Sequence, residues 1–136
     1  MLDNSQLRCL EALLDTIIPP DDFPGAVDAG VADYLLRQLA GDLAELLPSY
    51  RQWLGDLDAE SRASRDKPFA ELNVEERTSL LNGVERGEVT TDWSVEPEPF
   101  FRQVVEHCAE GYYSDPTNGG NRDGVGWRMI GYEVRG

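Results

Sequence analysis

His107 is the only histidine of the chain, and histidine is the side chain that proteins use most often as a general acid or base. It adjoins Cys108, but successive residues of a helix do not face each other, which disfavours a Cys–His dyad. Asp21 and Asp22 form a carboxylate pair in a loop, and hard cations such as calcium prefer oxygen ligands. A structural His107 and aspartates that serve solvation or helix capping explain these residues most simply. A stand-alone metal-assisted enzyme that uses Asp21, Asp22 and His107 is the alternative.

Four glycines near the C-terminus resemble the spacing of a phosphate-binding loop: Gly119, Gly120, Gly124 and Gly126. Such loops need a following helix whose N-terminus faces the anion, and the Walker form also needs a lysine. The glycine string contains no lysine, and the residues after it leave little room for a helix. We therefore expect no nucleotide site here.

The two cysteines, Cys9 and Cys108, lie in opposite ends of the chain. Their expected state is reduced and buried, as small apolar residues, and a disulfide between them is the alternative. With one histidine and no CxxC pattern, the chain lacks the ligand spacing of a zinc or haem site. We expect no metal, no cofactor and no catalytic group in this chain alone.

The segment 111–132 combines six of the chain's thirteen glycines with four large aromatic side chains. Each interior glycine costs a helix about 1 kcal/mol, whereas so many rings disfavour a disordered tail. We expect an ordered, irregular path of tight turns. Because Tyr, Trp and Arg are typical of interface hot spots, the candidate partner-binding residues are Tyr112, Tyr113, Asp115, Asn121, Arg122, Asp123, Trp127 and Arg128. Alternatively, the rings simply cover the helical core. The loop 19–25 is a secondary candidate for docking.

Elsewhere, apolar residues spaced three and four apart predict helices, and no stretch alternates convincingly as a strand. The first expected helix runs from Asn4 to about Ile18 and stops at two prolines. The last runs from Glu98 to Glu110, with Gly111 at the position after its end.

Between these helices, the pattern predicts a helix that is capped by Asp28, is interrupted at Gly41 and ends before Pro48. A short helix capped by Ser49 follows, and the capping-box pair Asn73 and Glu76 opens another. The expected fold is all-α: a single small domain over residues 1–136 with about four to six helices and a long irregular C-terminal segment rich in glycine and aromatic residues.

The chain has a net charge of −14, from 26 acidic and 12 basic residues. Such a surface repels phosphates, so nucleic acid and anionic membranes are poor partners. No apolar run is long enough to span a membrane, which predicts no direct membrane insertion. The charge favours solubility, and attraction of a basic partner surface is the second interpretation.

Two stretches together resemble the family of gluconate 2-dehydrogenase subunit 3, the gamma or small subunit. They are DTIIPPDDFPGAVDAGVADYL near the N-terminus and FFRQVVEHCAEGYYSDPTNGGNRDGVGWRMIGY near the C-terminus. The resemblance implies an accessory subunit that binds and stabilises a large FAD-dependent dehydrogenase of the glucose–methanol–choline type. That partner would hold the FAD and oxidise a sugar, a sugar acid or a glycoside, often with a multihaem cytochrome subunit as electron acceptor.

The resemblance also bears on location, because many family members begin with a twin-arginine export signal. This sequence begins with Met1-Leu2-Asp3. We expect a cytoplasmic protein if Met1 is the native start, and a periplasmic or exported one if a signal was removed. A chaperone-like protein without a stable partner is a further alternative to the accessory subunit.

Overall fold

The computed structural model describes residues 2–20 and 24–113 of the 136-residue chain. These residues form five α-helices and two 3-10 helices, and no strand occurs within them, which confirms the all-α prediction. The elements are α1 (Asn4–Ile17), α2 (Val31–Ala40), η1 (Ala44–Leu46), α3 (Leu47–Arg65), η2 (Phe69–Glu71), α4 (Val74–Glu85) and α5 (Pro97–Tyr112).

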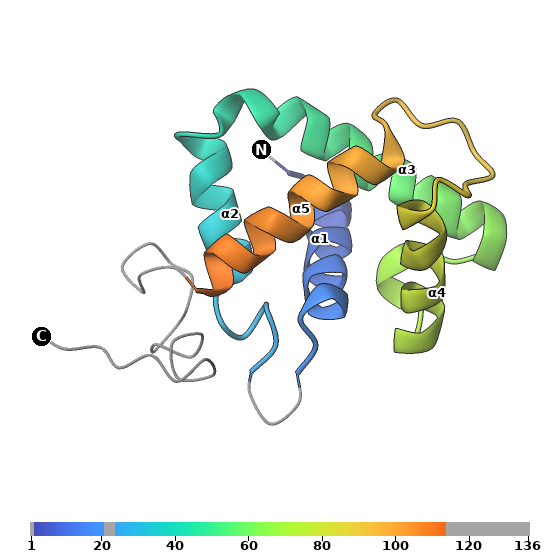
Figure 1. The fold of residues 1–136 in the computed structure, drawn as a ribbon, viewed down its shortest axis with the longest axis horizontal. Helices are drawn as coiled ribbons and strands as arrows, with labels where there is room; N and C mark the ends of the chain where they lie inside the picture. The colour runs from blue at the N-terminus through green and yellow to red at the C-terminus, as the bar shows by residue number, and fades with distance from the viewer. Residues whose placement is uncertain (1, 21–23, 114–136) are drawn as a thin grey trace, which may run out of the picture.

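Helix α1 is the centre of the arrangement. It contacts each of the other α-helices, and α5 lies across it with α2 on one side and α4 on the other (Figure 1). Apolar side chains at three- and four-residue spacing give α1 one buried face, which includes Leu10, Leu13 and Leu14. Burying each such leucine completely contributes about 1.5–3 kcal/mol.

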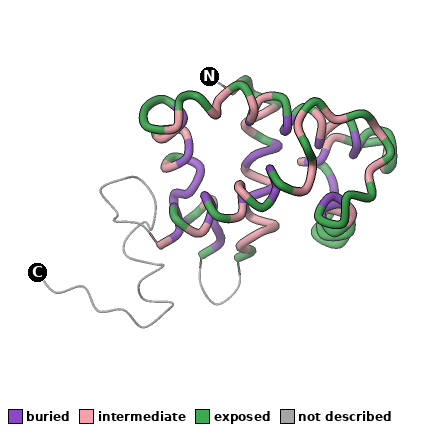
Figure 2. Tube along the Cα trace, turned by 45° about the horizontal axis from the view of Figure 1, so that its top comes forward, coloured by how far each residue is buried: buried purple, intermediate pink, exposed green. Residues whose placement is uncertain are grey.

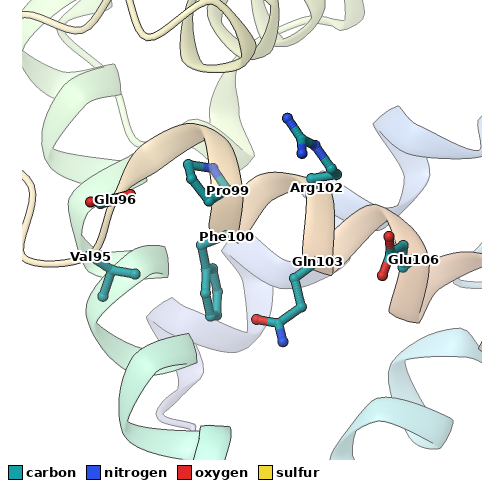
Figure 3. Close-up of a pocket in the computed structure, with 7 residues that line it drawn as sticks. All are labelled: Val95, Glu96, Pro99, Phe100, Arg102, Gln103 and Glu106. Carbon is teal, nitrogen blue, oxygen red and sulfur yellow. The ribbon is translucent and has the colours of Figure 1, made fainter.

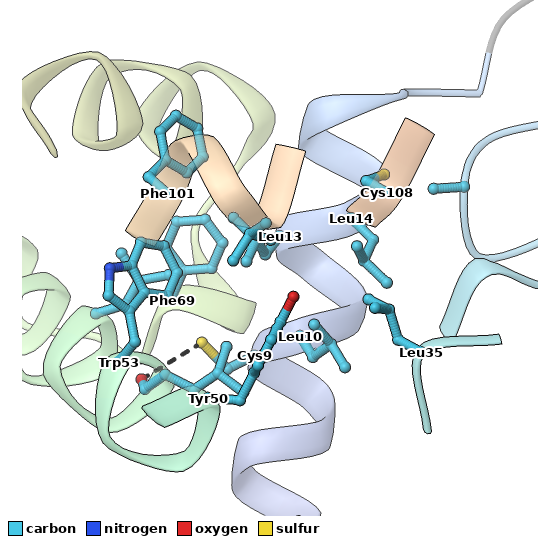
Figure 4. Close-up of a cluster of buried hydrophobic side chains, with 14 of the residues drawn as sticks. Cys9, Leu10, Leu13, Leu14, Leu35, Tyr50, Trp53, Phe69, Phe101 and Cys108 are labelled. Carbon is cyan, nitrogen blue, oxygen red and sulfur yellow. Dashed lines mark hydrogen bonds between the residues drawn. The ribbon is translucent and has the colours of Figure 1, made fainter. Parts of the chain in front are cut away.

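The core is built from large side chains that meet around α1. Tyr50 and Trp53 come from α3, Phe69 from η2 and Phe101 from α5, and they gather beside Leu13 (Figure 4). Trp53 stacks nearly parallel to Phe101, with ring centroids 6.1 Å apart. Along the chain trace, buried residues alternate with partly buried and exposed ones (Figure 2).

Two helices begin with complete capping boxes, of which the sequence predicted the one at the start of α4. Asp3 accepts a hydrogen bond from the Gln6 backbone N–H, and the Gln6 side chain accepts one from the Asp3 backbone N–H, so α1 has a complete capping box. Asn73 and Glu76 form the same reciprocal pair at the start of α4. Each cap satisfies backbone donors that a helix leaves unpaired.

The second helix begins differently from the prediction. Its N-cap is Gly30, with φ 88°, and no side chain caps it. Asp28 is exposed and lies two residues before this cap. Glycine adopts this left-handed conformation at no steric cost, so the backbone rather than an aspartate carboxylate sets the start of α2.

The third helix is longer than predicted. Pro48 was expected to follow the end of the preceding helix, but it lies in the first turn of α3. Proline is tolerated there because the N–H groups of a first turn have no partner within the helix. The helix was expected to be short, yet it runs 19 residues to Arg65 and ends at Asp66 with φ 62°. Beyond Leu57, the buried residues of α3 are Glu60 and Ser61. Because both are polar, the spacing of apolar residues did not predict this part of the helix.

Gly111 lies within α5 and does not end it, which corrects the predicted position after the helix. A methyl group at Gly111 would come within 2.6 Å of Tyr34 Cδ1 and 3.2 Å of Val31 Cγ1, both on α2. The glycine therefore allows α5 to approach α2 closely.

Candidate docking surfaces

The imidazole of His107 is engaged inside the protein. Its Nδ1 lies 2.5 Å from the Tyr50 hydroxyl oxygen, and the histidine is 8% exposed. Burial raises the pKa of Tyr50, and electrostatic interactions with Cys108 and Glu110 add to the shift. The phenol therefore keeps its proton and can donate it to Nδ1 when that nitrogen is the acceptor of the ring. This geometry fits a structural histidine.

Both cysteines are free and buried, as predicted for their reduced state. The Cys9 thiol donates to the Leu54 carbonyl at 3.8 Å (Figure 4). Burial, followed by the negative charge of Asp15, raises the pKa of Cys108 to about 12. Burial and then Asp58 raise the pKa of Cys9 in the same direction. Because the thiolate is the reactive form, both thiols are poor nucleophiles.

The described ranges 2–20 and 24–113 contain no group of three histidine, cysteine or acidic side chains that could hold a metal ion. Asp21 and Asp22 lie outside these ranges. Over the same residues, none of the helices combines the length and the apolar character that crossing a membrane requires.

The carboxylate of Glu60 holds the loop between α4 and α5. It accepts hydrogen bonds from the backbone N–H and the hydroxyl of both Thr90 and Thr91, at 2.7–3.0 Å, and from Trp93 Nε1 at 3.3 Å. Burial alone would raise the pKa of this carboxyl, but the bonds from Thr91 and Thr90 outweigh it and lower the pKa to about 2. The indole of Trp93 packs edge-on against Trp53, with centroids 5.6 Å apart.

Other acidic side chains hold loops in the same way. Asp15 on α1 accepts from the Val27 N–H at 2.9 Å, and Asp58 on α3 accepts from the Phe69 N–H at 2.9 Å. Asp56 accepts from the Ser94 N–H at 2.8 Å. Part of the chain's large negative charge therefore serves its own fold, and the sequence pattern did not reveal this use.

The structure describes two of the eight predicted docking residues. Tyr112 is fully buried, and its hydroxyl donates to the Pro24 carbonyl at 2.8 Å. Tyr112 thus packs in the core, the alternative that the sequence left open. Tyr113 is partly buried and meets Tyr112 edge-on, with centroids 5.2 Å apart. The other six, Asp115, Asn121, Arg122, Asp123, Trp127 and Arg128, lie outside the described residues.

A shallow hollow of about 460 Å³ lies along the first half of α5 (Figure 3). Phe100 and Gln103 point to one side of the helix, and Arg102 points to the other, where it pairs with Glu98. The remaining lining residues are Val95, Glu96, Pro99 and Glu106. This lining combines apolar side chains with acidic, amide and guanidinium groups.

Two further hollows follow one another along α4, on the side that faces α1. The first turn of α4 borders one of them, which is lined by Glu11, Ala12, Asp15, Pro19, Pro20, Val27, Val74 and Arg77. The rest of α4 borders the other, which is lined by Thr16, Ile17, Thr78, Leu81, Asn82, Glu85, Phe101 and Val105. We call these two hollows together the α1–α4 groove.

The α1–α4 groove contains two features that sequence reasoning missed. Val74 is 56% exposed, the large apolar side chain most open to solvent in the described part of the chain. Arg77 has a buried Nε without a hydrogen-bond partner. Exposure of Val74 could not be inferred from apolar periodicity, because the spacing treats every valine as a core candidate.

Comparison with protein families gives one match, to the family described as gluconate 2-dehydrogenase subunit 3, over residues 4–133. The chain belongs to this family. The match includes both stretches on which the resemblance was based and also the middle of the chain. Neither the curated proteins nor the solved structures gave a match.

The family description names a subunit of a dehydrogenase complex. The number 3 in that description implies that the complex contains several different chains. The matched range covers all five α-helices, the α1–α4 groove and most of the C-terminal residues.

Proposed function

We propose that this chain is a non-catalytic small subunit that binds and stabilises a large FAD-dependent dehydrogenase of the glucose–methanol–choline type. The partner holds the FAD and oxidises a sugar, a sugar acid or a glycoside, and a cytochrome subunit is a further component that takes up the electrons. The family match over residues 4–133 carries the proposal.

The histidine, the cysteines and the buried glutamate, which are candidates for catalysis by residue type, are used within the fold. Their contacts support a structural role for this chain. The His107 imidazole is bonded to a buried tyrosine, and the thiols of Cys9 and Cys108 have raised pKa values inside the core. The Glu60 carboxylate is occupied by five hydrogen-bond donors of a single loop. Each of these groups acts within the fold, which leaves the surface to supply the function.

In this proposal the docking surface includes Tyr113 and the C-terminal residues Asp115, Asn121, Arg122, Asp123, Trp127 and Arg128. Tyr112 anchors the start of that segment, because its ring is buried and its hydroxyl bonds to Pro24. Large aromatic and arginine side chains contribute most of the binding energy at many protein interfaces.

The test is co-expression of this chain with a flavoprotein dehydrogenase of the proposed class, taken from a neighbouring gene of the same genome. We expect the two to co-purify, and we expect the dehydrogenase to be more soluble and to contain more FAD than when it is expressed alone. A dehydrogenase that is equally soluble, flavinated and active without this chain contradicts the proposal.

A variant sharpens the test. Trp127→Ala should weaken co-purification more than it lowers the melting temperature of the free small subunit. An equal loss of binding and of stability would mean that Trp127 is a core residue, and the predicted docking role would be wrong.

A further inference from the structure

The α1–α4 groove has an unusual combination of groups for a surface that faces only water. Val74, at the start of α4, exposes an apolar side chain to solvent. Pro19 and Pro20, which are also exposed, border the same hollow. Ile17 and Val105, which are partly buried, provide apolar surface farther along. Apolar surface rimmed by polar groups is typical of interaction sites.

The charge of the groove indicates which side chains of a partner would complement it. Its lining includes three acidic side chains, Glu11, Asp15 and Glu85, against the basic Arg77. A lysine or arginine next to an apolar side chain on the partner would complement this arrangement. The charge of the whole chain, −14, acts in the same direction.

We propose that the α1–α4 groove binds a segment of the dehydrogenase subunit in which an apolar side chain stands next to a lysine or arginine. This inference rests on the proposed function, and it adds a second docking site, separate from the C-terminal residues. The apolar side chain lies against Val74, and the basic side chain faces Glu11 and Asp15.

Two substitutions test the groove without disturbing the core. Val74→Glu places a charge where an apolar contact is needed, and an acidic residue in the first turn of a helix is favourable for the fold. Glu11→Gln keeps the side-chain length and removes one of the negative charges that would face the partner's basic side chain. We expect each variant to bind the dehydrogenase subunit about tenfold more weakly, a hot-spot effect, with no fall in the melting temperature of the free chain.

The matched control is Ala44→Glu, which adds the same charge at an exposed position of η1 and should bind as the wild type does. The measurement is the dissociation constant by surface plasmon resonance, beside thermal unfolding of each free chain. Wild-type affinity in both groove variants would overturn this inference while leaving the proposed function standing. Failure of the wild-type chain itself to bind would overturn the proposed function, and the inference with it.

One further outcome concerns the occupant. If the free wild-type chain is a dimer in sedimentation velocity and Val74→Glu makes it a monomer, the groove binds a second copy of this chain. That result would overturn the assignment of a dehydrogenase segment.

Discussion

Glu60 keeps its negative charge inside the protein through neutral donors. Two backbone N–H groups, two hydroxyls and one indole N–H converge on its two oxygens. Hydrogen bonds to a charged group contribute about 1.5–3 kcal/mol each when the geometry is good. At the scale of single residues, this carboxylate is the strongest link between α3 and the loop before α5.

Replacing this carboxylate should destabilise the protein clearly. Glu60→Gln places an amide N–H₂ among donors, and we expect a loss of about 2–3 kcal/mol in the free energy of unfolding at pH 7. The measurement is urea unfolding followed by tryptophan fluorescence. The exposed control Glu71→Gln should stay close to wild type. A Glu60→Gln variant as stable as the control would contradict the prediction.

Wild type and Glu60→Gln should also differ in how their stability depends on pH. The folded-state pKa of Glu60 is about 2, below the ordinary value of 4.5, so its stabilising effect is present above pH 4.5 and is lost as the pH falls towards 2. The stability difference between wild type and Glu60→Gln should therefore shrink over that interval. A difference that is constant from pH 7 to pH 3 would mean that the charge of Glu60 does not matter.

The bond between Tyr50 and His107 gives another residue-scale prediction. Tyr50→Phe keeps the ring in the core and removes the hydroxyl that lies 2.5 Å from Nδ1. We expect a loss of about 1–2 kcal/mol in unfolding free energy, because Nδ1 is left without this partner. Tyr34→Phe, at a half-buried tyrosine, is the control for loss of a hydroxyl. Equal stability of the two variants would show that the bond contributes little.

At the scale of elements, the contact of α5 with α2 depends on Gly111. Alanine normally stabilises a helix relative to glycine by about 1 kcal/mol. At Gly111 the new methyl group would meet Tyr34 at 2.6 Å, so Gly111→Ala should instead destabilise by about 1–3 kcal/mol. Gly55 in α3 has open space around it, and Gly55→Ala should be neutral or stabilising. Thermal unfolding of both variants checks this difference in sign.

The ends of a helix could be predicted where they depend on neighbouring residues, and not where they depend on contacts with distant parts of the chain. The capping box of Asn73 and Glu76 is a local side-chain pattern, and it was visible in the sequence. The end of α3 was missed because its inward positions after Leu57 are the polar residues Glu60 and Ser61. Their partners, a distant loop and the Lys67 carbonyl, exist only once the chain has folded.

The candidate docking surfaces show the same limit. Tyr112 was predicted by its residue type to be either a docking or a core residue, and only its bond to Pro24, 88 residues away, decides for the core. The exposure of Val74 and the unpaired Nε of Arg77 depend on how α4 sits beside α1. Such features follow from packing between elements, which single-sequence patterns do not contain.

At the scale of the whole molecule, the charge of −14 should govern how fast a partner is found. Long-range attraction to a basic surface raises the association rate and is screened by salt. If the proposed complex forms, we expect its association rate constant to fall by about tenfold or more between 50 mM and 500 mM salt, with a smaller change in dissociation. Stopped-flow mixing measures both rates. An association rate that is independent of salt would show that the acidic surface faces water only.

The contact between Trp53 and Trp93 has a consequence for spectroscopy. The two indoles meet edge-on with centroids 5.6 Å apart, and one belongs to a helix while the other belongs to the loop held by Glu60. Rings at this separation couple their excited states, so near-ultraviolet circular dichroism and fluorescence will respond when the loop leaves α3. The protein thus contains an intrinsic optical probe of its own loop, which can report partner binding or local opening without an added label.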